Sequence, residues 1–391
     1  MSVSARSNRK LRVAVLNRHF GYRFGGAERY AAAVVEELAL RHEVHVFAQE
    51  IEHNFPGVTY HRIARPLSKP RWINQFWFAL ESWRQTRRGY DVVHSHENTW
   101  HGDLQTVHVR PLRIGLFHGR EGLRRALKWI SLCLSPRLLM YWRLEAARFH
   151  PKPGRQVAAT STQVMSEALT AYPSIAPFLH VISPGVQAPT SLLDPKAARV
   201  HLRLPLDVKL ALFIGNDYAK KGLATLLEAL ACIPNLHLAV VGSGQHKADF
   251  VRQAEQLAVS ERVHFLGSQP DMGPAYAAAD LLVHPTTEDT YAMVVLEAMA
   301  HGLPVIVSSA AHCGIAADLN HEQQALILTD PRNAQLLASL LKQLLDDPAL
   351  QAQMKFHGHL FASERSWETV GDQYDALLQL ICKIKIDNRA Q

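Results

Sequence analysis

The sequence has little cysteine and no long hydrophobic run. Its four cysteines lie far apart, and no Cys-x-x-Cys pair occurs. This spacing predicts neither a zinc site nor a disulfide framework and is typical of reduced thiols in a cytoplasmic protein. No apolar stretch approaches the roughly 18 residues that a membrane-spanning helix needs, and the basic start leads into a stretch too short for a signal peptide. We therefore expect a cytoplasmic chain that does not cross a membrane.

Fingerprints of metal and dinucleotide binding are also missing. There is no Asp-x-Asp, and the nearest approach to Gly-x-Gly-x-x-Gly is Gly242-Ser-Gly244, where Lys247 takes the third glycine position. Histidines cluster at positions 94, 96, 101 and 108, but we expect alternating histidines to face opposite sides of a strand. The sequence therefore predicts no metal site and no cofactor, and it argues against a nicotinamide-dependent dehydrogenase.

The composition indicates a globular protein of more than one domain. With 48% hydrophobic and 20% charged residues, disorder, collagen-like repeats and a coiled coil are excluded. A chain of 391 residues exceeds the size at which one core keeps growing. The net charge of +7 is unevenly divided, because residues 1–188 hold 26 Lys or Arg and 13 Asp or Glu, whereas residues 189–391 hold 16 and 22. We expect the +13 and −6 halves to face different partners.

Short apolar runs alternate with helical patterns along the chain. Predicted strands cover residues 12–16, 43–48, 58–63, 91–94, 105–109, 157–160 and 180–183, then 209–214, 237–241, 262–266, 280–284, 304–307 and 325–328. Predicted helices include residues 27–40, 223–233 and 334–345. This alternation predicts an α/β fold with two doubly wound parallel sheets. Residues 184–194, which contain two prolines, are the expected linker, and ligands are expected in a cleft between the domains.

Gly25 and Gly26 lie between the first predicted strand and a helix. Adjacent glycines at a helix start let backbone N–H groups approach an anion, although for the pair alone a tight strand-to-helix turn is the favoured explanation. Lys220 and Lys221 follow the first strand of the second series and precede Gly222. Cations at this place lie where a diphosphate would bind, with a solvated lysine pair as the alternative.

The segment from His284 to Pro304 is the most specific part of the sequence. We expect a strand to end at His284 and a helix to begin near Tyr291, so that Asp289 and Glu297 lie about two turns apart on one side. Glu297 stands in an apolar run, where a carboxylate is costly unless it is hydrogen-bonded. Ligand hydroxyls would satisfy it, and so would backbone groups or a lysine.

These segments resemble the retaining glycosyltransferases of family 4. The matching segments are Gly25-Gly26-Ala27-Glu28, Thr106-Val107-His108, Ser183-Pro184-Gly185-Val186, Lys220-Lys221-Gly222 and the carboxylate pair before Gly302-Leu303-Pro304. They extend over nearly the whole chain, and residues 215–222 are most similar to the lipopolysaccharide-core glucosyltransferases. The resemblance implies the GT-B fold, with a Rossmann-like acceptor- and membrane-facing domain (1–188) and a Rossmann-like nucleotide-sugar-binding domain (189–361). It also implies a C-terminal helix (362–391) that crosses back to the first domain.

The resemblance also implies roles for individual residues. Glu297 would accept hydrogen bonds from the donor's ribose, and Lys220 and Lys221 would neutralise its diphosphate without a metal. The candidate donor-binding residues are Gly25, Gly26, Lys220, Lys221, Glu288, Asp289, Thr290, Tyr291 and Glu297. The candidate catalytic residues are His108, which would lie beside the transferred sugar, Asp289 and Lys221.

Two residues depart from the family pattern. Asp289 replaces the first Glu of the Glu-x7-Glu motif, which contacts sugar hydroxyls, and its side chain is one methylene shorter. Either the sugar lies deeper in the site or Glu288 takes this role. Ala292 replaces a usual glycine, which could narrow the sugar pocket.

Aromatic and basic residues are interleaved in the first half. They fill residues 69–88, 124–129 and 137–143. Such helices suit an anionic bilayer surface, whereas no nucleic-acid-binding motif accompanies them. We expect peripheral attachment to the inner face of the cytoplasmic membrane, with burial of the tryptophans in the core as the alternative.

The sequence thus predicts a retaining hexosyltransferase that uses a nucleotide-diphosphate sugar, with a UDP-sugar favoured. The expected acceptor is a lipid-linked, lipopolysaccharide or other cell-envelope glycan. The alternative is a catalytically inactive relative that binds sugar nucleotides. The sugar, the linkage and the oligomeric state are left open.

Overall fold

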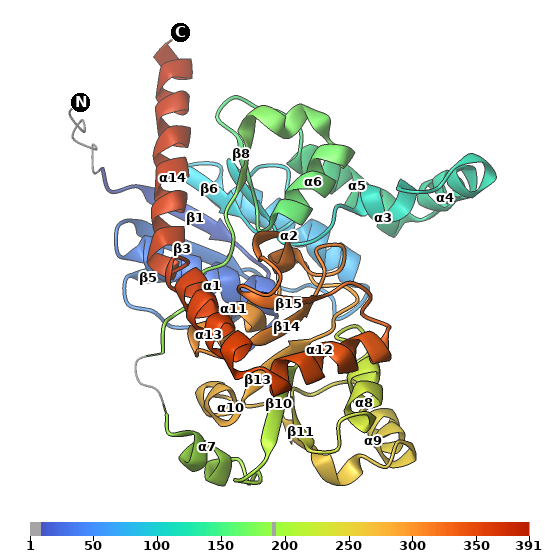
Figure 1. Ribbon diagram of the computed structural model, residues 1–391. Helices are drawn as coiled ribbons and strands as arrows, with labels where there is room; N and C mark the ends of the chain where they lie inside the picture. The colour runs from blue at the N-terminus through green and yellow to red at the C-terminus, as the bar shows by residue number, and fades with distance from the viewer. Residues whose placement is uncertain (1–8, 190–192, 391) are drawn as a thin grey trace. The chain divides into compact units, whose positions relative to one another are not determined.

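The computed structural model describes residues 9–189 and 193–390, which form two compact units (Figure 1). Unit 1 comprises Met1–Pro184 and Trp367–Gln391, and unit 2 comprises Gly185–Ser366. The sequence-based ranges divide the chain at 188 and 361 instead, whereas the helix α13 (Pro348–Ser363) belongs wholly to unit 2. Residues 190–192 of the expected linker and the basic start at residues 1–8 lie outside the described residues.

The sheet of unit 1 has seven parallel strands in the order β5-β3-β1-β6-β7-β8-β9. Their bounds are β1 Arg12–Leu16, β3 Glu43–Ala48, β5 Val58–Arg62, β6 Val92–Ser95, β7 Leu104–Val107, β8 Gln156–Ala159 and β9 Leu179–Val181. The strand order reverses between β1 and β6, so the loops that follow these two strands leave a crevice between them. A further pair, β2 (His19–Gly21) and β4 (Glu50–Glu52), forms a small parallel sheet that the sequence did not predict.

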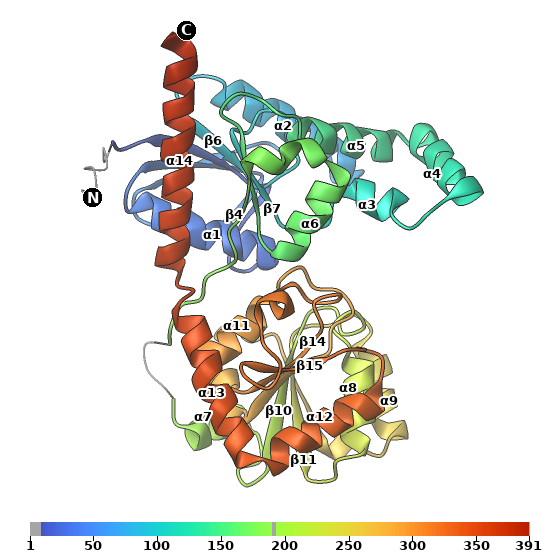
Figure 2. The ribbon, with the colours of Figure 1, turned by 45° about the horizontal axis from the view of Figure 1, so that its top comes forward.

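Helices cover both faces of this sheet. They are α1 Gly26–Ala39, α2 Arg71–Thr86, α3 Leu112–Phe117, α4 Gly122–Leu134, α5 Pro136–Arg148, α6 Thr162–Ala171 and α14 Trp367–Ala390, with the 3-10 helix η1 at Pro173–Phe178. The last helix, α14, packs against α1 (Figure 2), and the hydroxyls of Tyr30 and Tyr374 lie 2.9 Å apart. The return of the C-terminal helix to the first domain is therefore confirmed.

The sheet of unit 2 has six parallel strands in the order β12-β11-β10-β13-β14-β15. Their bounds are β10 Lys209–Ile214, β11 Leu236–Val241, β12 Val263–Gly267, β13 Leu281–His284, β14 Val305–Ser308 and β15 Ala325–Leu328. The helices are α7 Pro195–His201, α8 Leu223–Ala231, α9 Lys247–Gln256, α10 Gly273–Ala278, α11 Met293–Ala300, α12 Ala334–Asp346 and α13, with the 3-10 helices η2 Ser260–Arg262 and η3 Gly314–Asp318. The order reverses between β10 and β13, which places a second crevice there. The two predicted doubly wound α/β sheets are thus confirmed.

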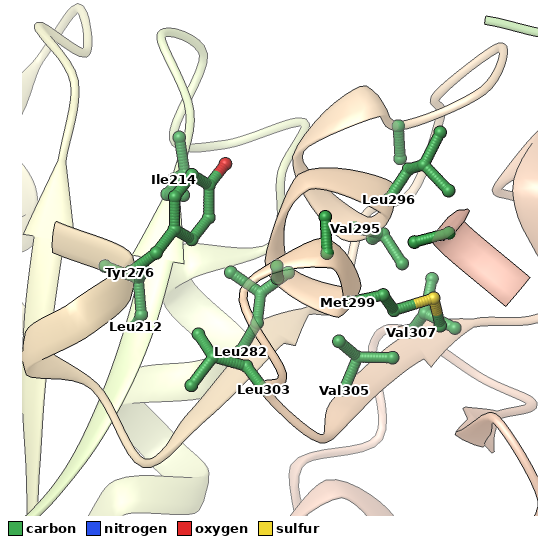
Figure 3. Packing of buried hydrophobic residues seen from close by; sticks show 14 of the residues in the cluster. Leu212, Ile214, Tyr276, Leu282, Val295, Leu296, Met299, Leu303, Val305 and Val307 are labelled. Carbon is green, nitrogen blue, oxygen red and sulfur yellow. The ribbon is translucent and has the colours of Figure 1, made fainter. Parts of the chain in front are cut away.

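Helix α11 is fixed against the sheet of unit 2 by apolar packing. Val295, Leu296 and Met299 are fully buried and belong to one cluster with Leu282 and Val305 (Figure 3). Full burial of side chains of this size contributes about 1.5–3 kcal/mol each. This packing sets the rotation of the helix that carries Glu297.

None of the described helices is long and apolar enough to cross a membrane.

Candidate functional site

Two loops meet at the crevice of unit 2, one after β10 and one after β13. The carbonyl oxygen of Lys220 accepts a hydrogen bond from the backbone N–H of Thr287 at 2.8 Å. It also accepts hydrogen bonds from the hydroxyls of Thr286 and Thr287, at 3.1 and 3.0 Å. Three hydrogen bonds to one carbonyl therefore hold the loop that contains Lys220 and Lys221 against the loop of residues 285–292.

Gly222 allows this close approach. Its φ is +80°, which favours glycine, and a Cβ here would lie 1.9 Å from the carbonyl oxygen of Pro285. Gly222 also precedes the first turn of α8, whose free N–H groups attract anions. The predicted lysine–glycine motif is thus a contact between two loops at the start of a helix.

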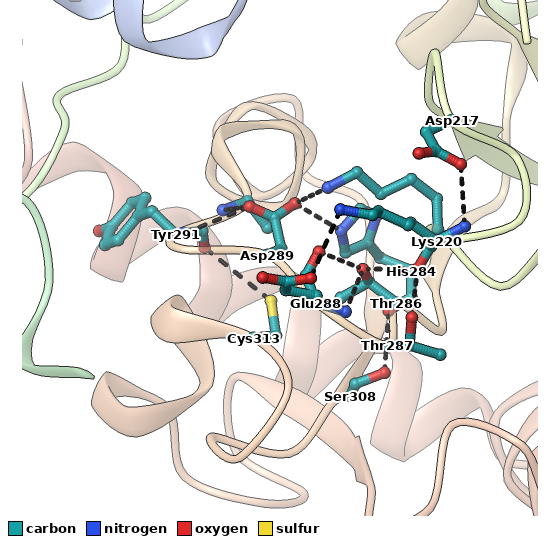
Figure 4. Close-up of polar contacts among 12 residues, drawn as sticks. Asp217, Lys220, His284, Thr286, Thr287, Glu288, Asp289, Tyr291, Ser308 and Cys313 are labelled. Carbon is teal, nitrogen blue, oxygen red and sulfur yellow. Dashed lines mark hydrogen bonds and ion pairs between the residues drawn. The ribbon is translucent and has the colours of Figure 1, made fainter. Parts of the chain in front are cut away.

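The carboxylate of Asp289 has four partners, which Figure 4 shows from one side. Its Oδ2 pairs with Nζ of Lys221 at 2.5 Å and accepts a hydrogen bond from Nε2 of His284 at 3.1 Å. Its Oδ1 accepts hydrogen bonds from the backbone N–H groups of Tyr291 and Ala292, at 3.3 and 2.9 Å. An ionised carboxylate offers about four acceptor positions, so Asp289 has none left over.

These contacts settle the charges around Asp289. Burial alone would raise its pKa, but the hydrogen bond with His284 and the charge of Lys221 outweigh burial and hold this pKa below its ordinary value. Burial lowers the pKa of His284. We therefore assign an ionised Asp289 paired with Lys221, and a neutral His284 that donates from Nε2.

The expectation that Asp289 and Glu297 share one helical face is wrong. Helix α11 begins at Met293 rather than near Tyr291, and Ala292 before it has a φ of +69°. This left-handed conformation interrupts the helical path at a cost of roughly 1–2 kcal/mol for a residue other than glycine. Asp289 consequently lies in the loop and folds back onto it, which also explains why a glycine would fit the position of Ala292.

A second set of backbone bonds supports the loop from the opposite side. Asp289 forms a parallel β-bridge with Cys313, donates to the carbonyl of His312 at 2.8 Å and accepts from Gly314 at 3.0 Å. The Cys313 side chain is fully buried, and burial raises the pKa of its thiol. The loop is therefore held on both sides without a ligand.

Glu288 and Lys220 form the exposed half of the site. Their side chains are each 60% exposed and lie 3.5 Å apart. An exposed pair of this kind contributes little to stability, so both side chains are available to a ligand. Thr290, between the two halves, is half-buried.

Glu297 is half-buried and accepts a hydrogen bond at 2.5 Å from the hydroxyl of Tyr276. Tyr276 stacks on His301, with ring centroids 4.6 Å apart. The sequence had suggested ligand hydroxyls, backbone or a lysine as partners of Glu297. A tyrosine of α10, 21 residues earlier in the chain, left no signal in the sequence.

His108, in unit 1, is buried beside another histidine. Its Nε2 lies 2.9 Å from Nδ1 of His96, and the ring of His96 lies 4.3 Å from that of His94. The expectation that alternating histidines point apart is wrong, because residues two apart on a strand share a face. Burial lowers the pKa of His94 and of His108 to about 3 and that of His96 well below its ordinary value. This histidine cluster (His94, His96 and His108) is therefore neutral near pH 7.

A chain of hydroxyls ties the histidine cluster to the C-terminal helix. Tyr30 donates to the carbonyl of Ile182 at 2.9 Å, so its oxygen accepts from Tyr374. Tyr374 lies 2.9 Å from Thr106, which lies 2.7 Å from Nε2 of His94. If each hydroxyl donates along this chain, Nε2 of His94 carries the proton. Nδ1 of His94 has no hydrogen-bond partner among the described residues.

The described residues contain no group of three or more His, Cys, Asp or Glu placed to hold a metal ion. Metal independence stays a prediction.

Gly25 and Gly26 mark the start of α1 in unit 1. A Cβ at Gly26 would meet no atom within 4 Å, so the backbone is open to a ligand there, although no conformation demands a glycine. The structure thus brings Lys220, Lys221, Glu288 and Asp289 together in unit 2, and it holds Gly25, Gly26 and His108 in unit 1. A shared cleft between the units stays a prediction.

Two family models match the chain, one in each half. Residues 24–188 match Glycosyltransferase Family 4, and residues 195–359 match Glycosyl transferases group 1. These consecutive matches confirm the resemblance that the motifs predicted.

Three curated relatives belong to lipopolysaccharide synthesis by name. LpsE of Rhizobium meliloti is 30% identical over 46% of this chain and 52% of its own length. WaaG of Escherichia coli is 33% identical over 36% of this chain and 38% of its own length. LpsD of Rhizobium meliloti is 26% identical over 66% of this chain and 80% of its own length. The chain thus spans about half, or less, of the length of the first two.

Solved structures with the same fold cover nearly the whole chain. The crystal structure of WaaG, a glycosyltransferase involved in lipopolysaccharide biosynthesis, has a TM-score of 0.78 at 21% identity and covers 94% of this chain and 99% of its own. Anabaena HepE in complex with UDP-glucose has a TM-score of 0.70 at 20% identity with the same coverage. These likenesses confirm the predicted GT-B fold.

Proposed function

Because the chain belongs to family 4 of the glycosyltransferases, we propose that it is a retaining hexosyltransferase that uses a nucleotide-diphosphate sugar. We favour UDP as the nucleotide, since HepE is described in complex with UDP-glucose. The names of LpsE, LpsD and WaaG support a lipopolysaccharide or other cell-envelope acceptor. The observation that carries most weight is the pair of loops at the crevice of unit 2, where two lysines adjoin the start of α8.

Sugar transfer releases a nucleoside diphosphate, and cations must stabilise the negative charge of this leaving group. The bond between the anomeric carbon and the diphosphate oxygen breaks, and a bond from the acceptor oxygen forms on the same face. The acceptor proton passes to the leaving phosphate. Lys220, Lys221 and the N-terminus of α8 stabilise the negative charge that develops, while Glu297 holds the ribose.

We assign the sugar-contacting carboxylate to Glu288 and a supporting role to Asp289. All acceptor positions of Asp289 are used by protein donors, so a sugar hydroxyl would have to displace one of them. Glu288 lies next to it with a 60% exposed side chain. Of the two alternatives that the sequence left open, the hydrogen bonds of Asp289 and the exposure of Glu288 favour the second.

A donor panel with variants tests the proposal. Glu297→Ala is expected to abolish transfer with an unchanged fold, whereas Glu261→Gln, an exposed residue of the same unit, leaves the rate unaltered. Product formation is followed by mass spectrometry. Transfer at the wild-type rate in Glu297→Ala would refute the site, and UDP binding without transfer or hydrolysis of any donor would favour an inactive sugar-nucleotide-binding relative.

We also propose that α4 attaches the chain to the inner face of the cytoplasmic membrane. Leu123, Leu127, Ile130 and Leu134 form one stripe on this helix and are 76%, 55%, 54% and 77% exposed. Exposed arginines on the same helix complement anionic lipids. By contrast, the aromatic segment of α2 is partly core, since Phe78 is fully buried.

Vesicle flotation tests the attachment. The triple variant Leu123→Ser/Leu127→Ser/Ile130→Ser should lose binding to phosphatidylglycerol vesicles. Phe356→Ser, which removes a 67% exposed side chain from α13, should not. Equal flotation of the wild-type chain with phosphatidylcholine vesicles in moderate salt would exclude the electrostatic contribution, and equal flotation of the triple variant would exclude the stripe.

A further inference from the structure

A cavity of about 320 Å³ lies in unit 1, lined by residues of α3, α4, α6 and the turn between α3 and α4. Figure 2 labels these three helices. Three arginines line it, Arg113, Arg120 and Arg125, and are called the cavity arginines below. Ile114 and Phe117 contribute apolar wall. The volume lies at the lower end of the range of about 300–1,000 Å³ that is typical of small-molecule sites. Among the described residues that line it, none belongs to the predicted donor or catalytic set.

The positive charge of the cavity arginines is not neutralised by carboxylates of the described residues. Within the part of the chain that the structure describes, the cavity arginines form no ion pair. The nearby carboxylates already have partners: Glu145 accepts from the backbone of Leu112 and from Tyr172, and Glu167 pairs with Arg110 at 2.6 Å. Glu121 is the one acidic residue of the lining, against three arginines. The cavity therefore has a net positive charge.

Parts of this arrangement are held in position without a ligand. Nη1 of Arg120 donates to the carbonyls of Gly115 and Leu116, at 2.7 and 2.5 Å. The guanidinium of Arg113 lies 5.4 Å from the centroid of the Tyr172 ring. Side chains that are already ordered lose less entropy on binding.

The first turn of α4 adds to the positive potential. Glu121 precedes this 13-residue helix, and its side chain forms no capping hydrogen bond. Unpaired N–H groups and the helix dipole at such a terminus attract an anion. The N-terminus of α4 and the cavity arginines therefore both favour a negatively charged ligand.

We propose that this cavity binds a phosphoryl group, which the cavity arginines hold by paired N–H···O contacts. The apolar wall takes the adjoining part of the same ligand. Phe117 stacks on Trp129 of α4 with ring centroids 4.6 Å apart, so the wall continues into the exposed helix. The phosphoryl group is carried either by a membrane lipid or by a phosphorylated glycan. Binding of a phosphoryl group in this cavity does not depend on the proposed sugar transfer.

Arginine modification by phenylglyoxal, resolved by peptide mass spectrometry, tests this site. Inorganic phosphate at twice its Kd is expected to slow modification of the cavity arginines about threefold, because the rate follows the free fraction. Arg137 and Arg143, exposed on α5, serve as controls. Vesicles of phosphatidic acid and of phosphatidylcholine form the second arm. Protection by phosphate but not by phosphatidic acid vesicles indicates a soluble phosphorylated ligand, and protection by phosphatidic acid vesicles indicates a lipid headgroup.

A double variant makes the test specific. In Arg113→Gln/Arg125→Gln the protection of Arg120 should fall from about threefold to none, whereas Arg137→Gln/Arg143→Gln should keep it. Tryptophan fluorescence checks that unit 1 is folded. Absence of protection in both arms, equal protection of the control arginines, or full protection of Arg120 in the double variant would each overturn the proposal.

Discussion

Asp289→Asn should destabilise unit 2 by about 3 kcal/mol. The change leaves Lys221, whose side chain is only 23% exposed, without its partner at 2.5 Å. Breaking a buried ion pair by removing one partner costs about 3–5 kcal/mol. We expect the lower end, because Lys221 retains some solvent and the asparagine oxygen can still accept from Tyr291 and Ala292.

The positions of the tryptophans determine which spectroscopic signal reports the unfolding of each unit. All seven belong to unit 1, at positions 72, 77, 83, 100, 129, 142 and 367. Tryptophan fluorescence therefore reports unit 1, whereas circular dichroism during urea unfolding reports both units. A loss of about 3 kcal/mol moves the midpoint of the unit 2 transition by about 1–3 M urea.

Glu288→Gln is the matched control, since it removes an exposed charge pair from the same loop and should cost less than about 1 kcal/mol. The pKa of Asp289 is lowered in the folded state, so its contribution to stability is present above the pKa of the unfolded carboxyl and is lost as pH falls below it. The Asn variant should lack this part of the acid dependence. Equal stabilities of Asp289→Asn and the wild-type chain at pH 7 would refute the ion-pair reasoning.

Three further predictions use the same preparations. Gly222→Ala should destabilise unit 2 by more than the roughly 1–2 kcal/mol of a left-handed residue, because its Cβ would lie 1.9 Å from Pro285 O; an unchanged urea transition would contradict the loop contact. Tyr276→Phe removes the hydrogen bond that positions the Glu297 carboxylate. A hydrogen bond to a charged group contributes about 1.5–3 kcal/mol, and if UDP binding loses this amount, calorimetry should show about 10-fold or greater weakening of the affinity. Unaltered affinity would argue against Glu297 as a ribose ligand. In unit 1 the histidine cluster has lowered pKa values, so the unfolded chain takes up protons first and stability falls as pH drops below about 6.5, by about 1.4 kcal/mol per pH unit for each histidine. Tryptophan fluorescence in urea at pH 7 and pH 5 measures this loss, and equal stabilities would show that the histidines are not held neutral.

The strands of both sheets were predictable because buried parallel strands are short, nearly continuous apolar runs. Each of the thirteen predicted runs matches a strand to within two residues at either end. The two strands of the small sheet were missed, since His19–Gly21 and Glu50–Glu52 have no apolar pattern.

The lysine and carboxylate loops of unit 2 were predictable for a topological reason. Polar residues at the carboxyl ends of parallel strands meet where the strand order reverses. The same rule could have identified His284, the last residue of β13, as a partner of Asp289. Tyr276 could not be found in this way, because its contact with Glu297 depends on the packing of α10 beside α11.

The start of α11 was mispredicted because of one residue. Ala292 has high helix propensity, yet its φ of +69° separates Asp289 from the helix. The usual glycine of the family at this position indicates a left-handed turn, but its replacement was interpreted only as an effect on the size of the sugar pocket. The histidines were expected to point to opposite sides of the strand. That expectation was wrong because side chains two residues apart on a strand point to the same face, as His94 and His96 do.

The stereochemistry of transfer tests the central claim most directly. Methanol serves as a surrogate acceptor with a panel of UDP-hexoses, and proton NMR determines the anomer of the methyl glycoside that forms. For an α-linked donor we predict the α-glycoside from the wild-type chain and none from Glu297→Ala. A β-glycoside, or the same product yield from Glu297→Ala, would contradict a retaining transferase with its donor site in unit 2.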